Sequence, residues 1–82
     1  MQFYGIINQV KRGMRMQFQL KDEYITLAQL LKVCSVVASG GEAKEYLKQE
    51  SVFLNGNPEN RRGKKIYSGD VVETNGVRIE VQ

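Results

Sequence analysis

The chain has 82 residues, enough for one domain, and its net charge of +3 includes Lys11, Arg12 and Arg15 at the N-terminus. Residues 16–82 are neutral overall, so total charge does not by itself indicate a nucleic-acid partner. One cysteine and no histidine exclude an internal disulfide and argue against a metal site, a Cys–His nucleophile and a cofactor held by such residues. Apolar runs are too short for a membrane span and no secretory signal is recognisable, so we expect a cytoplasmic protein.

The first fifteen residues have the least interpretable pattern. Residues 3–7 could form a short strand, and residues 10–15 look like a basic tail. A clearer pattern follows, in which apolar side chains alternate with polar ones as in a half-buried strand: Met16, Phe18 and Leu20. We therefore expect an extension over residues 1–15 and a single domain over residues 16–82. One hypothesis is that Met16 is the natural start.

The segment from residue 26 to residue 49 is predicted to form two helices. Thr26 is followed three residues later by Gln29, the spacing of a capping box that satisfies free N–H groups at a helix start. Ser39 and Glu42 repeat this spacing. Each helix then shows one apolar stripe, consisting of Leu27, Leu30, Leu31, Cys34, Val37 and Ala38 in the first and Ala43, Tyr46 and Leu47 in the second. Such short helices need a cover for these stripes.

Strands and tight turns fill the rest of the chain. The predicted strands are Val52–Leu54, Ile66–Tyr67, Val71–Glu73 and Val77–Val81. Asn55-Gly56 and Asn75-Gly76 predict tight turns, because both positions of such a turn favour a positive φ. The expected fold is α+β, with two short helices in a helix–corner–helix packed on a small, mostly antiparallel sheet.

A basic run between two of these strands is the first candidate for function. Arg61, Arg62, Lys64 and Lys65 lie within five residues, whereas the rest of residues 16–82 is net acidic. Such a cluster attracts phosphates, and Gly63 lets a backbone approach closely. The simpler interpretation is a solvated loop that keeps a hairpin soluble.

The expected corner, Ser39-Gly40-Gly41, is the second candidate. A helix start presents free N–H groups to an anion, and glycines remove side-chain bulk beside it. Lys44 and Lys48 lie one turn apart on the polar face of the same helix, and Lys32 on the first helix could extend the surface. The simpler interpretation is a glycine-assisted turn with charges on a wet face.

The aromatic residues and the thiol divide into core and surface candidates. We predict that Tyr46, Phe53 and Cys34 pack in the core. Tyr67 directly follows the basic run and is the aromatic side chain best placed to stack on a base or ribose. The acids are scattered without a spacing that acid–base chemistry requires, so we expect no enzyme activity.

The order of these features resembles the RNA-binding domain named after ribosomal small-subunit protein S-four, over roughly Tyr24 to Glu73. The resemblance rests on four segments: the leucine-bearing first helix Thr26–Val37, the second-helix start Ser39-Gly40-Gly41-Glu42-Ala43-Lys44, the strand and turn Val52–Gly56, and the turn Gly69-Asp70-Val71. The stretch from Glu59 to Lys65 is most similar to small stand-alone bacterial members of the YaaA type.

The resemblance implies a helix pair with the αL motif on a small sheet, which binds structured RNA such as ribosomal or transfer RNA as a ribosome-associated monomer. It implies RNA-binding residues in two groups: Lys32, Ser39, Gly40, Gly41, Lys44 and Lys48 on the helices, and Arg61, Arg62, Lys64, Lys65 and Tyr67 beyond them. Many members have arginines near positions 26 and 40, where this chain has Thr26 and Gly40. Backbone N–H groups and the basic run would then supply the missing phosphate contacts.

Two other functions remain open at this level. A protein-interaction module could dock through the helix pair, with the basic loop on an acidic partner. The helix–corner–helix also superficially looks like a DNA-binding helix-turn-helix. Its second helix, however, carries Glu42 and Glu45 where a groove-reading helix needs amides and bases.

Overall fold

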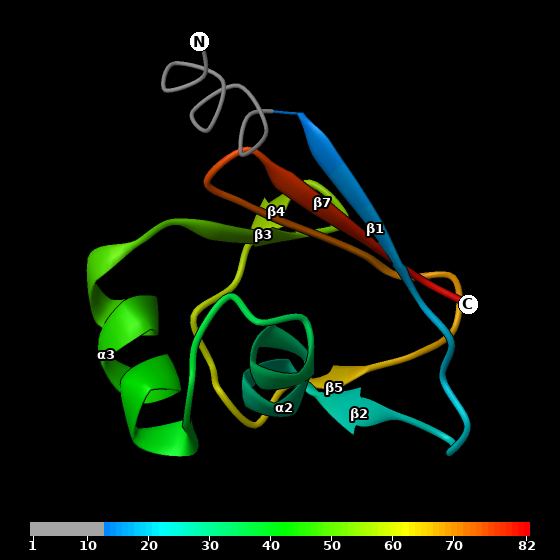
Figure 1. Cartoon of the computed structure of the whole chain (residues 1–82), viewed down its shortest axis with the longest axis horizontal. Coiled ribbons are helices and arrows are strands. Elements are labelled where there is room, and N and C mark those ends of the chain that lie inside the picture. The colour runs from blue at the N-terminus through cyan, green and yellow to red at the C-terminus, as the bar shows by residue number, and fades with distance from the viewer. Residues whose placement is uncertain (1–12) are drawn as a thin grey trace, which may run out of the picture.

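The computed structural model describes residues 13–82 and has two layers (Figure 1). Helices α2 (Leu27–Val33) and α3 (Gly40–Gln49) lie on one side of a five-stranded sheet. The strands of this sheet lie in the spatial order β1 (Met14–Phe18), β7 (Val77–Val81), β6 (Val71–Thr74), β3 (Val52–Leu54) and β4 (Asn57–Pro58). A separate two-stranded ribbon pairs β2 (Ile25–Thr26) with β5 (Lys65–Ile66). The expected α+β class is confirmed.

The sheet is antiparallel except at one edge, where β1 runs parallel to β7. Both predicted Asn-Gly turns are present, with φ of 51° and 85° at Asn55 and Gly56 and 47° and 77° at Asn75 and Gly76. Strand β1 begins at Met14. The strand suggested for residues 3–7 lies outside the described residues.

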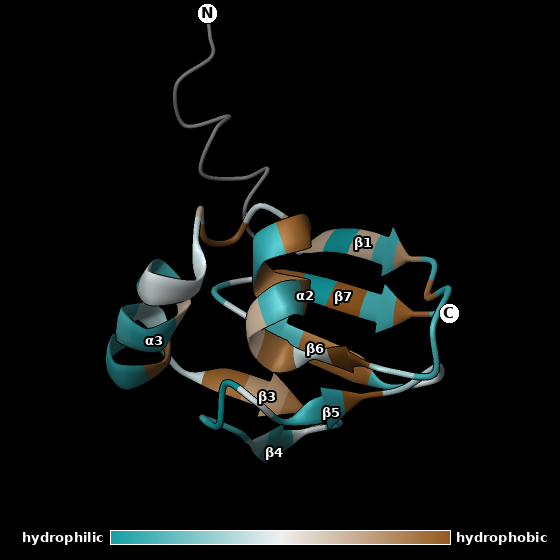
Figure 2. Cartoon of the chain, turned by 90° about the horizontal axis from the view of Figure 1, so that it is seen from below, coloured by the Kyte–Doolittle hydropathy of each residue, from teal (hydrophilic) through white to brown (hydrophobic). Residues whose placement is uncertain are grey.

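The core lies between the helices and one face of the sheet. Figure 2 shows α2 lying across the strands, with apolar and polar residues alternating along β1 and β7. Leu27, Leu30 and Leu31 of α2 are fully buried. They belong to one cluster with buried residues of α3, the sheet and the ribbon: Ala43, Leu47, Val52, Ile66, Val72, Ile79 and Val81. The sheet therefore covers the helical stripes, as the sequence predicts.

The first helix is shorter than its apolar stripe indicates. Helix α2 ends at Val33, and Ser35 adopts a left-handed φ of 62°. The N–H of Ser35 donates to the carbonyl of Lys32 and that of Val36 to the carbonyl of Leu31, at 3.0 and 2.9 Å, the hydrogen bonds of a Schellman motif. The corner is therefore the segment 35–39, whereas Gly40 and Gly41, which were predicted to belong to it, lie in the first turn of α3.

This ending corrects two further predictions. Val37 is buried, but from the corner segment and not from a helix. Ala38 is exposed, so its assignment to the buried stripe was wrong.

The core prediction for Phe53 is wrong as well, because its side chain is 37% exposed. Its neighbours Val52 and Leu54 face inward, and alternation along β3 therefore points Phe53 outward.

The core assignments of Cys34 and Tyr46 are confirmed. Cys34 is buried, and this burial raises the pKa of its thiol. Tyr46 is half-buried against the core, and its hydroxyl lies 2.7 Å from Thr74 Oγ1, a buried hydroxyl that donates to the carbonyl of Ser51. This chain of hydrogen bonds joins α3 to β6.

The caps at the two helix starts differ. The Gln29 N–H donates to Thr26 Oγ1 and the Thr26 N–H to Gln29 Oε1, at 3.2 and 3.1 Å, which completes the predicted capping box. At the second helix the Glu42 N–H donates to Ser39 Oγ, but the Glu42 carboxylate accepts from Ala38 N–H at 2.8 Å. The second box is therefore only half formed.

Replacing the first cap should measurably destabilise the fold. We expect Thr26→Ala to lower the free energy of unfolding by about 1 kcal/mol, because it leaves a helix N–H without its acceptor. For a domain of this size that corresponds to a Tm lower by about 4–8 °C in thermal unfolding followed by circular dichroism. Thr26→Ser keeps the hydroxyl and should stay within about 0.5 kcal/mol; equal losses in both variants would argue against the cap.

Candidate nucleic-acid interface

The loop that carries the basic run is fixed by the start of helix α2. The N–H groups of Leu27 and Ala28 donate to the carbonyls of Lys64 and Arg62, at 2.8 and 2.9 Å. Within the loop, the Lys64 N–H donates to the carbonyl of Arg61 and closes a turn. Helix N–H groups that lack partners within α2 thus define the path of the loop.

The first charge of the run is compensated locally. The Arg61 guanidinium donates to both carboxylate oxygens of Glu59, at 2.9 and 3.1 Å. The Glu59 side chain is only 9% exposed, and the hydrogen bond from Arg61 lowers the pKa of its carboxyl. Arg61 therefore contributes less net positive charge to the surface than the sequence indicates.

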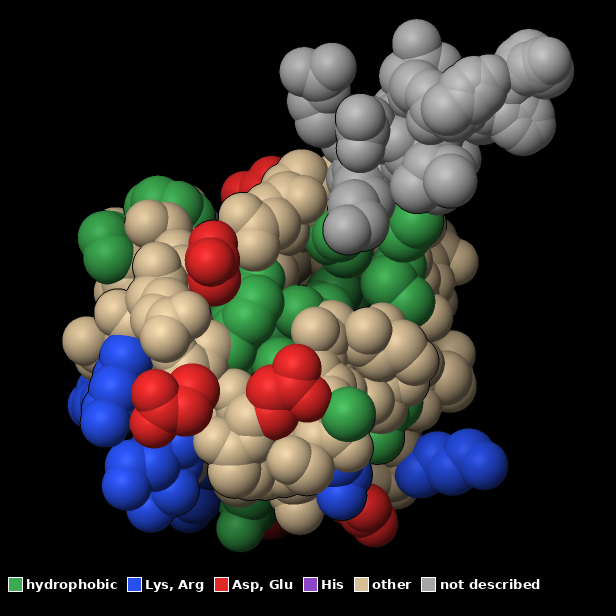
Figure 3. All heavy atoms as spheres, turned by 60° about the vertical axis from the view of Figure 1, so that its left-hand side comes forward, with side chains coloured by type: hydrophobic (Ala, Val, Ile, Leu, Met, Phe, Trp, Pro, Cys, Tyr) green, Lys and Arg blue, Asp and Glu red, His purple; other side chains and the backbone are tan. Residues whose placement is uncertain are grey.

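The second charge of the run lies beside helix α3. Arg62 lines a hollow of about 340 Å³ together with Lys44, Lys48, Leu47 and Asn60. We call Lys44, Lys48 and Arg62 the basic cleft. Lys48 has Glu45 3.7 Å away, whereas no carboxylate within residues 13–82 forms an ion pair with Lys44 or Arg62. On the face toward α3, Lys and Arg side chains gather at the lower left, beside several carboxylates (Figure 3).

The end of the run lies on a different part of the surface, at the β2–β5 ribbon. Lys65 Nζ lies 4.8 Å from the ring centroid of Tyr24, and the rings of Tyr24 and Tyr67 are 6.1 Å apart. Tyr67 is 44% exposed, as expected for a side chain available for stacking. The sequence does not indicate Tyr24 as a site residue, because it comes to lie beside Tyr67 only through the pairing of Ile25 with Ile66. Lys64 is half-buried and supplies its carbonyl to α2.

The remaining predicted site residues lie outside the basic cleft. Ser39 caps α3, and Gly40 and Gly41 form its first turn. A Cβ at Gly40 would meet nothing within 4 Å, so the fold itself does not require glycine there. Lys32 lines two other hollows, one of them shared with Glu42 of α3. The structure thus unites Lys44, Lys48 and Arg62 around one hollow, which Lys32, Ser39, Gly40 and Gly41 do not line.

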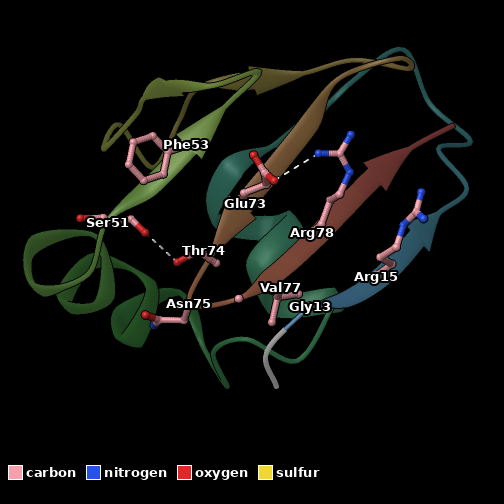
Figure 4. A pocket seen from close by; sticks show the side chains of 10 residues that line it. Gly13, Arg15, Ser51, Phe53, Glu73, Thr74, Asn75, Val77 and Arg78 are labelled. Carbon is pink, nitrogen blue, oxygen red and sulfur yellow. Dashed lines mark hydrogen bonds and ion pairs between the residues drawn. The ribbon is translucent and has the colours of Figure 1, made fainter. Parts of the chain in front are cut away.

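A larger hollow, of about 800 Å³, lies on the outer face of the sheet and has a different character. Figure 4 shows Arg78 directed toward Glu73, with Phe53 on the neighbouring strand. The Arg78 guanidinium donates to Glu73 at 3.1 Å and to Glu80 at 3.2 Å, and Arg15 donates to Glu80 at 2.9 Å. These two arginines and two glutamates compensate one another, so among residues 13–82 they leave this face little net positive charge for phosphate.

The same ion pairs predict how stability depends on pH. Hydrogen bonds from Arg15, Arg78 and Gln17 lower the pKa of Glu80 below its usual value near 4.5. A carboxyl whose pKa is lower in the folded than in the unfolded chain stabilises the fold above its unfolded pKa, and that contribution is lost as the pH falls through the folded value. Urea unfolding should show stability falling below about pH 4.5. Glu80→Gln should lose less stability between pH 7 and pH 3 than the native chain; an identical loss would contradict this account.

The described part of the chain was also searched for a metal site and for a membrane-spanning helix. Residues 13–82 contain no group of three or more His, Cys, Asp or Glu side chains placed to bind a metal ion. None of the helices in that range has the length and apolar character that crossing a membrane requires.

Comparisons with known proteins agree with this fold. The family model described as the S4 domain matches residues 18–82, a range that contains both helices, the ribbon and the whole basic cleft. A protein of Bacillus subtilis (strain 168), described as probable ribosome maturation protein RlbA, is 54% identical to this chain over 54 residues. The aligned segment covers 66% of this chain and 76% of that protein.

Proposed function

The chain belongs to the S4 domain family, and we propose that it is a non-catalytic protein that binds structured RNA in the bacterial cytoplasm. Ribosomal RNA, or a ribosome-assembly particle, is the leading partner, since the similar Bacillus subtilis protein is described as a probable ribosome maturation protein. We further propose that the protein acts as a monomer, because its apolar helical stripes are already covered by its own sheet.

The observation that carries this proposal is the basic cleft. Lys44 and Lys48 come from helix α3, and Arg62 comes from a loop that two hydrogen bonds fix to α2. Three cations from two separate segments therefore surround one hollow. Lysine and arginine in such an arrangement contact phosphate oxygens, which position RNA without reading its sequence.

The surrounding surface suggests recognition of shape and backbone. A-form RNA helices are recognised largely through phosphates and 2′-hydroxyls. Asn60, also part of this hollow, is an amide that could contact a 2′-hydroxyl. Lys32, Lys64, Lys65 and the helix start at Ser39, Gly40 and Gly41 lie outside the cleft and would contact further phosphates of a longer RNA.

A salt titration tests the proposal directly. If four to six phosphates are contacted, the logarithm of the association constant should fall against the logarithm of salt concentration with a slope of roughly −3 to −5. Fluorescence anisotropy with a labelled ribosomal RNA hairpin measures this slope, and duplex DNA and an acidic protein serve as competitors at equal salt. A slope near zero, or equally effective competition by the acidic protein, would contradict RNA binding through phosphates.

A further inference from the structure

Two exposed tyrosines meet at the end of the β2–β5 ribbon. Tyr24 is 38% exposed and Tyr67 is 44% exposed. Their ring centroids lie 6.1 Å apart, with an angle of 53° between the ring planes. The rings are therefore neighbours but do not stack face to face, and aromatic surface remains open to solvent.

The backbone on both sides of this pair is well fixed. Ile25 pairs with Ile66 in the ribbon, and Ile66 is fully buried. The N–H of Tyr67 donates to Asp70 Oδ2 at 2.8 Å, and Asn55 Nδ2 donates to Asp70 Oδ1 at 3.0 Å. The rings thus project from a rigid base, which reduces the entropy that a ligand must remove on binding.

Lysine side chains lie beside the same aromatic surface. Lys65 Nζ lies over the Tyr24 ring, 4.8 Å from its centroid. A hollow of about 510 Å³ next to Tyr24 is also lined by Lys21, Lys32 and one carboxylate, Asp22. Aromatic faces with lysines beside them are the combination that binds a nucleobase and its flanking phosphates, because the base stacks while the cations attract the backbone.

We propose that Tyr24 and Tyr67 form a stacking site for one unpaired nucleobase of the bound RNA. This inference rests on the proposed RNA binding and adds to it that the target contains an unpaired nucleotide, in a bulge or loop, beside a helical segment. The helical segment lies along the basic cleft, and the unpaired base lies at the ribbon. Lys65 contacts a phosphate next to that base.

Two hairpin RNAs that differ only by one bulged adenosine test the stacking site. The native chain should bind the bulged hairpin about 10-fold more tightly than the fully paired one, since stacking on an aromatic side chain contributes roughly 1–3 kcal/mol per base. The double variant Tyr24→Leu/Tyr67→Leu should lose this preference and bind the paired hairpin as the native chain does. Tyr24→Phe/Tyr67→Phe keeps the rings and should keep the preference.

A second measurement on the native chain does not depend on the variants folding. The sequence has four tyrosines and no tryptophan, so its intrinsic emission comes from tyrosine. The bulged hairpin should quench this emission more than the paired hairpin at equal saturation. Equal affinity and equal quenching for the two hairpins, with a normal salt slope, would overturn the stacking site and leave RNA binding intact. Failure of both hairpins to bind would overturn both proposals.

Discussion

Replacing Lys44 and Arg62 together by glutamine should weaken binding of a structured RNA by about 25- to 60-fold at 0.1 M salt. Each phosphate contact adds about 0.7 to 0.9 to the slope of log K against log salt, so two lost contacts should flatten it by about 1.4 to 1.8. These two side chains line one hollow and lack carboxylate partners within residues 13–82. Anisotropy titrations at several salt concentrations measure both quantities.

A matched variant on the opposite face distinguishes the contribution of the basic cleft to binding from that of total charge. Arg15→Gln/Arg78→Gln also removes two positive charges, but from the outer face of the sheet, where both arginines already have glutamate partners. At 0.1 M salt, charges more than about 10 Å from the RNA are largely screened, so binding should change by less than about 3-fold. Similar losses in the two variants would mean that the cleft is not the site.

Leu30→Ala should destabilise the fold more than any surface change. Leu30 is fully buried in the cluster that joins α2 to the sheet. Removing a buried leucine side chain costs about 2–5 kcal/mol, from lost burial and the cavity that remains. In a small domain each 1 kcal/mol lowers Tm by about 4–8 °C, so a loss of ~3 kcal/mol should lower it by about 12–24 °C. Urea unfolding at pH 7 gives the free energy directly.

Val33 on the same helix provides the control for that substitution. Its side chain is 51% exposed, so Val33→Ala should change the free energy of unfolding by less than about 1 kcal/mol. A comparable loss in the two variants would show that burial against the sheet does not explain the effect of Leu30→Ala, because helix propensity favours alanine at both positions.

Much of the sheet could be predicted because its signals are local. The alternation of Val77, Ile79 and Val81 with Arg78 and Glu80 indicated which side faces the core, and Ile79 and Val81 are indeed buried. The two Asn-Gly pairs marked turns through their preference for positive φ. The core prediction for Phe53 rested on its place within a strand, although alternation with Val52 and Leu54 indicates an outward position.

The end of the first helix could not be predicted from its sequence. A left-handed residue at a helix end is usually glycine, and here it is Ser35. The apolar stripe also continues to Val37, which is buried from the corner segment. The parallel pairing of β1 with β7 joins distant parts of the chain and leaves no local signal.

The sequence indicated which basic residues could form the candidate site, but not how they are arranged in space. The basic run was evident in the sequence. That its side chains separate to three different parts of the surface was not, because tertiary contacts determine where each one lies. Arg61 pairs with Glu59, Arg62 lines the hollow beside α3, and Lys65 lies over Tyr24.

Crosslinking in living cells tests the central claim most directly. Ultraviolet irradiation, followed by sequencing of the attached RNA and mass spectrometry of the attached peptides, identifies partner and surface together. The account predicts structured ribosomal RNA crosslinked to peptides that contain Lys44, Lys48, Arg62 or the Tyr24–Tyr67 pair. Recovery of no RNA above background, or crosslinks confined to the outer face of the sheet around Phe53 and Arg78, would contradict it.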